Sequence, residues 1–156
     1  MQYKLSADDR VRAKPDFVTQ VTVTNNSSIV KLTTISFPQK AIESSSHVKT
    51  AGIPLKIGAG QSVKVPSLNT GIIQTDLTTF QTWQYGPLQS REDPQPYSFE
   101  TTIPANSTIV VKAIVSINEL SANYLATVKS RYTGAVKKIQ GRWTGIQVGN
   151  VHYQIR

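Results

Sequence analysis

Residues 103–117 read IPANSTIVVKAIVSI and give the clearest indication of the fold. The first part of this stretch contains Pro104 and Asn106, residue types that favour turns. Residues 108–117 are dominated by valine and isoleucine, which favour β-strands, and they are apolar enough to be covered on both faces. This stretch therefore predicts a turn followed by a buried strand.

Strand patterns continue on both sides of this stretch. Residues 97–103 predict a strand before it, and residues 120–132 alternate apolar and polar positions after it. A turn is predicted at residues 133–134, and residues 136–139 and 145–155 predict two short closing strands.

The N-terminal half shows similar patterns. Residues 17–23 and 29–37 predict two strands around the turn-prone run NNSS. Residues 68–85, rich in threonine and aromatic residues, predict one long strand with a candidate break at Gly71. Residues 86–96 contain three prolines and an acidic pair and therefore predict a loop.

These patterns predict about eight strands and no helix of ten or more residues. We expect an all-β, mainly antiparallel fold with more than about 40% strand and under about 10% helix. Trp143 lies between Gly141 and Gly145, which leave room for a large ring to pack across neighbouring strands. The residues expected in the core are Val110, Ile114, Tyr124, Val128, Trp143 and Ile146.

The length of 156 residues fits one domain. We predict a polar, irregular leader over residues 1–15 and a single β-domain over residues 16–156. The N-terminus lacks the apolar stretch of a secretion signal, and no run approaches the roughly 20 apolar residues of a membrane helix. The absence of cysteine excludes disulfides, thiolate metal ligands and cysteine nucleophiles.

The net charge of +8 favours an acidic partner. The densest basic groups are Lys129 with Arg131, and Lys137, Lys138 with Arg142. Lys137, Lys138 and Arg142 are candidate contacts for an anion or a lipid headgroup, with a solvated basic surface as the alternative.

The chain shows no pattern of an enzyme. Two acidic pairs, Asp8 with Asp9 and Glu92 with Asp93, are expected in solvated turns rather than in a calcium or acid–base site. His47 and His152 are the only histidines, too few for a zinc site without cysteine. We therefore expect no enzymatic activity, no metal and no cofactor. Two aromatic residues, Trp83 and Tyr85, are candidates for ligand stacking, with core packing as the alternative.

A segment over residues 41–67 has the two-faced alternation of a membrane-spanning hairpin. Its apolar positions, expected to face lipid, are Ala51, Ile53, Leu55, Ile57, Val63 and Val65. Its polar positions, expected to line a watery lumen, are Thr50, Lys56, Ser62 and Lys64. Pro54 cannot donate a ladder hydrogen bond and is placed near the hairpin tip. The alternative is a hairpin that only packs on the soluble sheet.

The order of these features resembles the aerolysin and clostridial epsilon-toxin/mosquitocidal-toxin superfamily. The resemblance lies in four features in this order: the strand and polar turn VTVTNNSSIVKLTT (residues 21–34), the serine-rich segment SSSHVKTAGIPLKIGAG (44–60), the threonine-rich strand that returns from it, and the pair IPANSTIVVKAIV (103–115) and GRWTGIQVGNVHYQI (141–155). It implies an elongated, twisted antiparallel sheet or β-sandwich like the pore-forming module of these toxins. It also implies secretion, ring assembly and a β-barrel pore made from one hairpin per protomer.

The function implied by this resemblance is that of a secreted, cytolytic β-pore-forming protein. The expected partners are a target-cell membrane, a glycan or protein receptor, further copies of the chain on the membrane, and a candidate partner subunit; nucleic acid is not expected. One alternative is a non-lytic basic β-domain that binds glycan, lipid headgroups or nucleic acid. Another is a β-sandwich shell protein that contacts packaged RNA.

Overall fold

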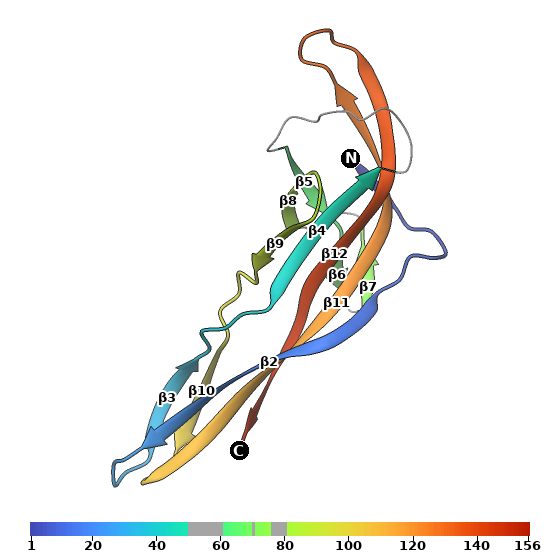
Figure 1. Ribbon diagram of the computed structural model, residues 1–156. Coiled ribbons are helices and arrows are strands. Elements are labelled where there is room, and N and C mark those ends of the chain that lie inside the picture. The colour runs from blue at the N-terminus through green and yellow to red at the C-terminus, as the bar shows by residue number, and fades with distance from the viewer. Residues whose placement is uncertain (50–60, 70, 76–80) are drawn as a thin grey trace. The chain divides into compact units, whose positions relative to one another are not determined.

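The computed structural model describes residues 1–49, 61–69, 71–75 and 81–156 (Figure 1). No helix occurs in these residues, and strands make up 70%; accordingly, no described helix is long and apolar enough to span a membrane. The strands are β1 (Gln2–Lys4), β2 (Arg12–Asn25), β3 (Lys31–Ser36), β4 (Ile42–Lys49), β5 (Ser62–Val65), β6 (Ser67–Asn69), β7 (Ile72–Gln74), β8 (Gln81–Gln84), β9 (Gln89–Glu92), β10 (Ser98–Ile103), β11 (Ser107–Lys129) and β12 (Val136–Ile155).

The largest sheet has the strand order β1-β11-β12-β4-β9, and β2 also pairs with β11. Three two-stranded sheets pair β10 with β3, β5 with β8, and β6 with β7. Every pairing with a described register is antiparallel. The predicted all-β, antiparallel fold is confirmed.

The described chain divides into two compact units, each assembled from three separate segments. Unit 1 comprises residues 1–13, 43–91 and 118–147, and unit 2 comprises residues 14–42, 92–117 and 148–156. The chain first passes from unit 1 to unit 2 after Ala13. That the chain forms a single β-domain from residue 16 stays a prediction.

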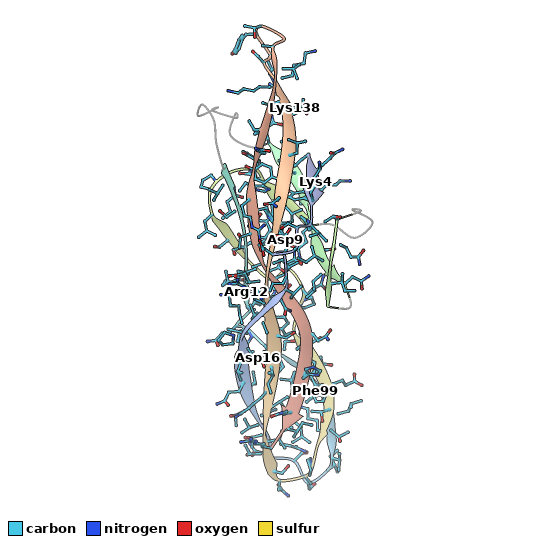
Figure 2. The ribbon with its side chains drawn as sticks, turned by 90° about the vertical axis from the view of Figure 1, so that its right-hand side faces the viewer. Lys4, Asp9, Arg12, Asp16, Phe99 and Lys138 are labelled. Atoms are coloured by element: carbon cyan, nitrogen blue, oxygen red, sulfur yellow. The ribbon has the colours of Figure 1, made fainter. Side chains whose placement is uncertain are left out.

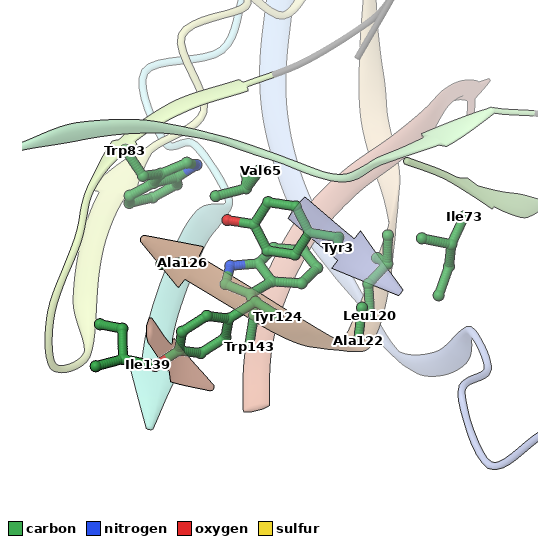
Figure 3. Packing of buried hydrophobic residues seen from close by; sticks show 10 residues of the cluster. All are labelled: Tyr3, Val65, Ile73, Trp83, Leu120, Ala122, Tyr124, Ala126, Ile139 and Trp143. Carbon is green, nitrogen blue, oxygen red and sulfur yellow. The ribbon is translucent and has the colours of Figure 1, made fainter. Parts of the chain in front are cut away.

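The core of unit 1 is built around large aromatic rings (Figure 3). Trp143 is fully buried between strands and packs edge-on against Tyr3, with ring centroids 5.9 Å apart. Tyr124 is also buried, and its hydroxyl bonds that of Tyr85 at 2.9 Å. Smaller side chains complete this core: Val65, Ile73, Leu120, Ala122, Ala126 and Ile139, with Trp83.

Unit 2 has its own core, in which Phe99 stacks on Tyr153 with ring centroids 4.9 Å apart. Its buried members are Ile35, Phe37, Ala41, Tyr97, Val111, Ala113 and Val115. Asp93 is also buried, and it accepts hydrogen bonds from the Tyr97 hydroxyl at 2.8 Å and from the Gln95 amide at 3.0 Å. The prediction of a solvated turn at Glu92 and Asp93 is therefore wrong for Asp93, because its buried carboxylate forms hydrogen bonds to two residues that precede β10.

Two pairs of predicted strands are each a single long strand. β11 spans 23 residues without a break, and β12 spans 20. β12 continues through Gly141 and Gly145, and both glycines make room for close packing. A Cβ at Gly145 would meet the Trp143 ring, and a Cβ at Gly141 would meet Tyr124 and the Val48 carbonyl oxygen. The predicted packing of Trp143 over a glycine is confirmed.

The core prediction is right for two of its six residues, and in the first half of β11 it selects the neighbours of the residues that are buried. Tyr124 and Trp143 are buried as expected. The remaining four, Val110, Ile114, Val128 and Ile146, are only half-buried. In β11 the inward positions are Val111, Ala113 and Val115, so the strand does not have two equally covered faces. A run that is apolar at every position gives no parity from which the inward face can be chosen.

Three further expectations are corrected. The N-terminal leader contains a strand, β1, in which Tyr3 is buried and pairs with Tyr124 of β11. The candidate break at Gly71 is found, so the single long strand predicted over residues 68–85 is divided: β6 and β7 form a hairpin, and Gly71 has a φ of 79°. The proline-bearing loop contains β9, whose place at the end of the sheet order suits a short strand between prolines.

Candidate membrane-insertion segment

The described flanks of the candidate insertion segment lie in different sheets. Upstream, β4 pairs with β12, from Ser44 opposite Ile146 to Lys49 opposite Gly141. Downstream, β5 pairs with β8, from Ser62 opposite Gln84 to Val65 opposite Gln81. The two described flanks are therefore paired with β12 and β8, and not with each other. Six of the predicted lipid- and lumen-facing positions lie outside the described residues: Thr50, Ala51, Ile53, Leu55, Lys56 and Ile57.

The buried face of β4 is polar. Glu43, Ser45 and His47 alternate along the strand and are 2%, 1% and 6% exposed. The apolar side chains of the same strand lie on the other face, where Ile42 is 52% exposed and Val48 is 61% exposed. This arrangement is the reverse of an ordinary half-buried strand, which places its apolar residues inward. Burying a polar group costs free energy unless a partner in the protein compensates it, so the contacts of these three side chains decide how β4 is held.

Ser45 is held by Trp143. The indole N–H of Trp143 donates to Ser45 Oγ at 3.0 Å. Ser45 lies opposite Gly145 in the β4–β12 register, and the Trp143 ring lies over Gly145. The missing side chain of Gly145 thus gives the indole access to the serine.

Glu43 is held by Arg91 of β9. The two side chains form an ion pair at 3.3 Å, and the Glu43 side chain is 3% exposed. The Arg91 guanidinium also lies 4.2 Å from the ring centroid of Trp83 and donates to the carbonyl oxygen of Thr82 at 3.3 Å. Gln81 donates to Glu43 at 3.3 Å. A single carboxylate therefore connects β4 with β8 and β9.

His47 lies among aromatic rings. Its Nε2 shares a hydrogen bond of 3.0 Å with the Tyr3 hydroxyl. Its ring lies 4.9 Å from that of Tyr85 and 5.3 Å from that of Tyr124. The Nδ1 atom is buried and has no hydrogen-bond partner among the described residues.

Burial dominates the titration of this cluster. Desolvation lowers the pKa of His47 to about 4, so the imidazole is neutral at pH 7. Desolvation likewise raises the pKa of the Tyr3 and Tyr124 hydroxyls, with a further contribution from Tyr85 in each case. The cluster is therefore uncharged at neutral pH, and a proton on His47 would enter it without a carboxylate partner.

The downstream flank is anchored differently. Val65 is fully buried in the unit 1 core, Val63 is half-buried, and Ser62 and Lys64 are exposed. Gln147 of β12 forms two hydrogen bonds with the chain just after β5. Its side chain donates to the Pro66 carbonyl oxygen at 2.7 Å and accepts from the Leu68 amide at 3.1 Å. β5 thus alternates, with its apolar side chains turned inward; the lipid- and lumen-facing roles of these residues stay predictions.

The basic candidates are not brought together. Lys137 and Lys138 are exposed on β12 near its turn with β11. Arg142 is instead half-buried, and its guanidinium forms an ion pair with Asp9 and donates hydrogen bonds to Asn123 at 3.1 Å and Ser121 at 2.8 Å. Asp9 in turn accepts from the Ser6 amide at 2.6 Å, so it fixes a turn rather than standing in solvent.

The two aromatic candidates lie against the protein rather than open to a ligand. Trp83 is 6% exposed, and its indole N–H donates to Gln81 at 3.1 Å. Tyr85 is half-buried in the His47 cluster. Among the described residues, no cluster of three or more histidine, aspartate or glutamate side chains is arranged to hold a metal ion.

Sequence analysis missed the residues that anchor β4. The signal was present in the alternation of Glu43, Ser45 and His47 on one parity. Its meaning depends on partners that are far away in sequence, such as Trp143, 98 positions after Ser45.

Comparison with known proteins identifies the fold. No protein-family model matches the chain, and no curated protein matches it by sequence. Among solved structures, the lamprey immune protein superposes over 100% of this chain with a TM-score of 0.53 and 18% identity. The Mpp75Aa1.1 β-pore-forming protein of Brevibacillus laterosporus superposes over 99% of this chain, with a TM-score of 0.52 and 14% identity.

The fold is that of the aerolysin-like β-pore-forming toxins. The chain spans about half of the lamprey protein (48%) and 69% of the Brevibacillus protein. At these identities the likeness establishes the fold, and it is the fold implied by the sequence resemblance.

Proposed function

We propose that this chain perforates membranes: copies assemble on a target membrane, and each inserts residues 44–67 as a β-hairpin. The fold shared with a β-pore-forming protein supports this proposal. So does the physics of the bilayer, in which a spanning segment must pair all of its backbone groups, as a closed barrel of hairpins does. Each arm needs about 9–11 residues with alternating faces.

The observation that carries the proposal is the polar attachment of β4. Glu43, Ser45 and His47 are held by hydrogen bonds and an ion pair rather than by buried aliphatic side chains. A typical hydrogen bond contributes only about 0.5–1.5 kcal/mol net, because water replaces it when it breaks. The side chains that β4 itself buries are polar, whereas β11 buries Val111, Ala113 and Val115, so releasing β4 moves fewer buried aliphatic side chains into water than releasing β11 would.

The downstream flank is compatible with the same movement for a different reason. Val65 leaves an apolar core, and in the inserted hairpin it would enter lipid, so one apolar environment replaces another. The exposed Ser62 and Lys64 would face the aqueous lumen. A lumen carrying Lys56 and Lys64 from every protomer would hold positive charge and favour anions.

A second candidate is a non-lytic module that binds membranes or glycans through its basic residues. It is favoured by the exposed Lys137 and Lys138, whose charges have no ion-pair partner among the described residues. The two candidates differ in whether lipid vesicles become permeable.

The test is dye release from liposomes, followed by electron microscopy of the same sample. The pore proposal predicts release together with rings on the vesicles. Binding to vesicles without release and without rings would contradict it and favour the second candidate.

A further inference from the structure

The turn between β11 and β12 concentrates exposed positive charge. Four cations here are exposed, and none forms an ion pair with a described residue: Lys129, Arg131, Lys137 and Lys138. Together with Tyr132 they are called the basic tip. The sequence offers them little neutralisation nearby, because none of the nine carboxylates lies after Glu119. Six of the seventeen lysines and arginines do lie there. The part of the chain after Glu119 therefore has a net side-chain charge of +6, and four of these six cations lie in or beside the turn.

The hairpin extends beyond its neighbours in the sheet. The described pairing of β1 with β11 ends at Leu125, and that of β4 with β12 ends at Gly141. In Figure 1 the orange hairpin continues past both strands, and Figure 2 labels Lys138 on this part of it. Ala126 and Ile139 still pack into the core, whereas residues 131–138 are all exposed. The basic tip is thus a projection with a packed base.

Tyr132 stands at the apex of this projection and is 100% exposed, whereas every other described aromatic residue is buried or half-buried. The turn that carries it is well bonded. Ser130 Oγ accepts from the amides of Tyr132 at 3.3 Å and Thr133 at 3.2 Å, and the Ser130 amide donates to the Ala135 carbonyl oxygen at 2.8 Å. Gly134 supplies the positive φ of 70° that the turn needs. The aromatic ring is presented by an ordered turn rather than by a loose loop.

We propose that the basic tip docks end-on to an anionic lipid bilayer, with Tyr132 in the interface and the four cations at the phosphates. Tyrosine is enriched at the level of lipid headgroups, where its ring is partly in hydrocarbon and its hydroxyl is in water. Val136, 62% exposed beside the turn, adds apolar surface at the same end. A convex hairpin end fits a flat membrane and does not offer the groove that would follow a nucleic-acid strand.

The geometry of a strand pair explains why the approach is end-on. Each of the four cations lies within three residues of the turn formed by residues 130–135, which corresponds to about 10 Å along a strand. That distance is about one Debye length at physiological salt, so all four feel the surface potential. Lys137 and Lys138 are adjacent and point to opposite faces, so a hairpin lying flat would engage only one of them.

The proposal goes beyond the proposed pore function, because docking does not require any segment to insert. The test is co-sedimentation with vesicles of phosphatidylcholine alone and with vesicles in which part of that lipid is phosphatidylserine. The tip variant carries Lys129→Gln, Arg131→Gln, Lys137→Gln and Lys138→Gln. The matched control carries Arg10→Gln, Arg12→Gln, Lys31→Gln and Arg156→Gln, which are exposed elsewhere and remove the same charge.

The wild type should bind the anionic vesicles, and binding should weaken as salt is added. Each lost cation should weaken binding about fivefold, so the tip variant should lose at least about two orders of magnitude. The control should lose much less, and Tyr132→Ser should weaken binding without changing the salt dependence. Equal losses of binding in the tip variant and the control would overturn the proposal. So would a wild type that does not bind anionic vesicles, or one that is released from them when RNA is added.

Discussion

The indole N–H of Trp143 donates a hydrogen bond to Ser45 Oγ at 3.0 Å, and this bond joins β12 to the strand that leads into the candidate insertion segment. The ring reaches the serine across Gly145, where any side chain would occupy its place. The same pair therefore belongs to the core of unit 1 and to the attachment of β4. Substitutions at the two residues should separate these roles.

Trp143→Ala should lower the free energy of unfolding by about 3–5 kcal/mol, because a fully buried aromatic ring is replaced by a cavity. Ser45→Ala should cost only about 1–3 kcal/mol, since it leaves the buried indole N–H without its partner. Urea unfolding measures both. Tyr132→Ala is the control for loss of an exposed aromatic ring and should be nearly neutral. A Trp143→Ala protein as stable as the wild type would show that the ring is not buried.

Gly141→Ala and Gly145→Ala should both destabilise the protein, and Gly141→Ala should be the worse of the two. A methyl group at Gly145 meets the Trp143 ring, which can shift, at a typical overpacking cost of about 1–3 kcal/mol. A methyl group at Gly141 meets the backbone carbonyl oxygen of Val48 and also Tyr124. Thermal melting of the two variants gives the order, and the reverse order would contradict the packing described for β12.

His47 should make stability dependent on pH in the mildly acidic range. Its pKa is about 4 in the folded protein and about 6.5 when unfolded, so the unfolded chain binds the proton more readily. The contribution of neutral His47 is therefore complete above about pH 6.5 and is lost as the pH falls towards 4, up to about 3 kcal/mol. The rings that face His47 belong to Tyr3, Tyr85 and Tyr124, and none of these contacts is with a carboxylate.

The measurement is urea unfolding at several pH values between 7 and 4. His47→Gln should be less stable than the wild type at pH 7 and should show a flatter pH profile. His152→Gln removes an exposed imidazole and should leave the wild-type profile unchanged. A wild-type profile that His47→Gln does not flatten would contradict the assignment.

The predicted faces of the insertion segment can be tested at two positions. Ile53→Asp would place a charge against lipid at a cost of up to a few kcal/mol, and it should abolish dye release. Thr50→Asp adds the same charge on the predicted lumen side and should be tolerated. Both proteins should melt like the wild type. Equal effects of the two substitutions on dye release would show that the predicted alternation does not define lipid and lumen faces.

The sequence predicted the fold class and several individual features. Strand-forming runs separated by turn residues predicted the antiparallel all-β fold, and the two glycines beside Trp143 predicted its packing. These predictions succeeded because they depend on local patterns. The lengths of β11 and β12 were missed because neither Asn118 nor Gly141 breaks a strand when the neighbouring strands continue alongside.

The candidate site was less predictable. The ion pair of Glu43 with Arg91 and the bond of His47 with Tyr3 connect residues more than 40 positions apart, so no local pattern indicates them. In the sequence Arg142 is close to Lys137 and Lys138, which predicts a basic cluster, yet in the structure its guanidinium forms an ion pair with Asp9. The lipid and lumen faces assigned to residues 50–57 stay predictions.

The most direct measurement fixes β4 to β12. Ser46 and Thr144 lie opposite each other in this pairing, at a separation typical of antiparallel partners that a disulfide can bridge. The chain has no other cysteine. Ser46→Cys with Thr144→Cys should therefore form one disulfide that holds β4 in place. Ser36→Cys with Ser98→Cys is the control, since these exposed residues are paired between β3 and β10 in unit 2.

Dye release from liposomes is then measured before and after reduction. We expect the β4–β12 disulfide to abolish release and reduction to restore it, while the control disulfide has no effect. The oxidised β4–β12 protein should still bind anionic vesicles, because its basic tip is unchanged. Release by the oxidised protein at the wild-type rate would contradict the account, since perforation would then proceed without departure of β4.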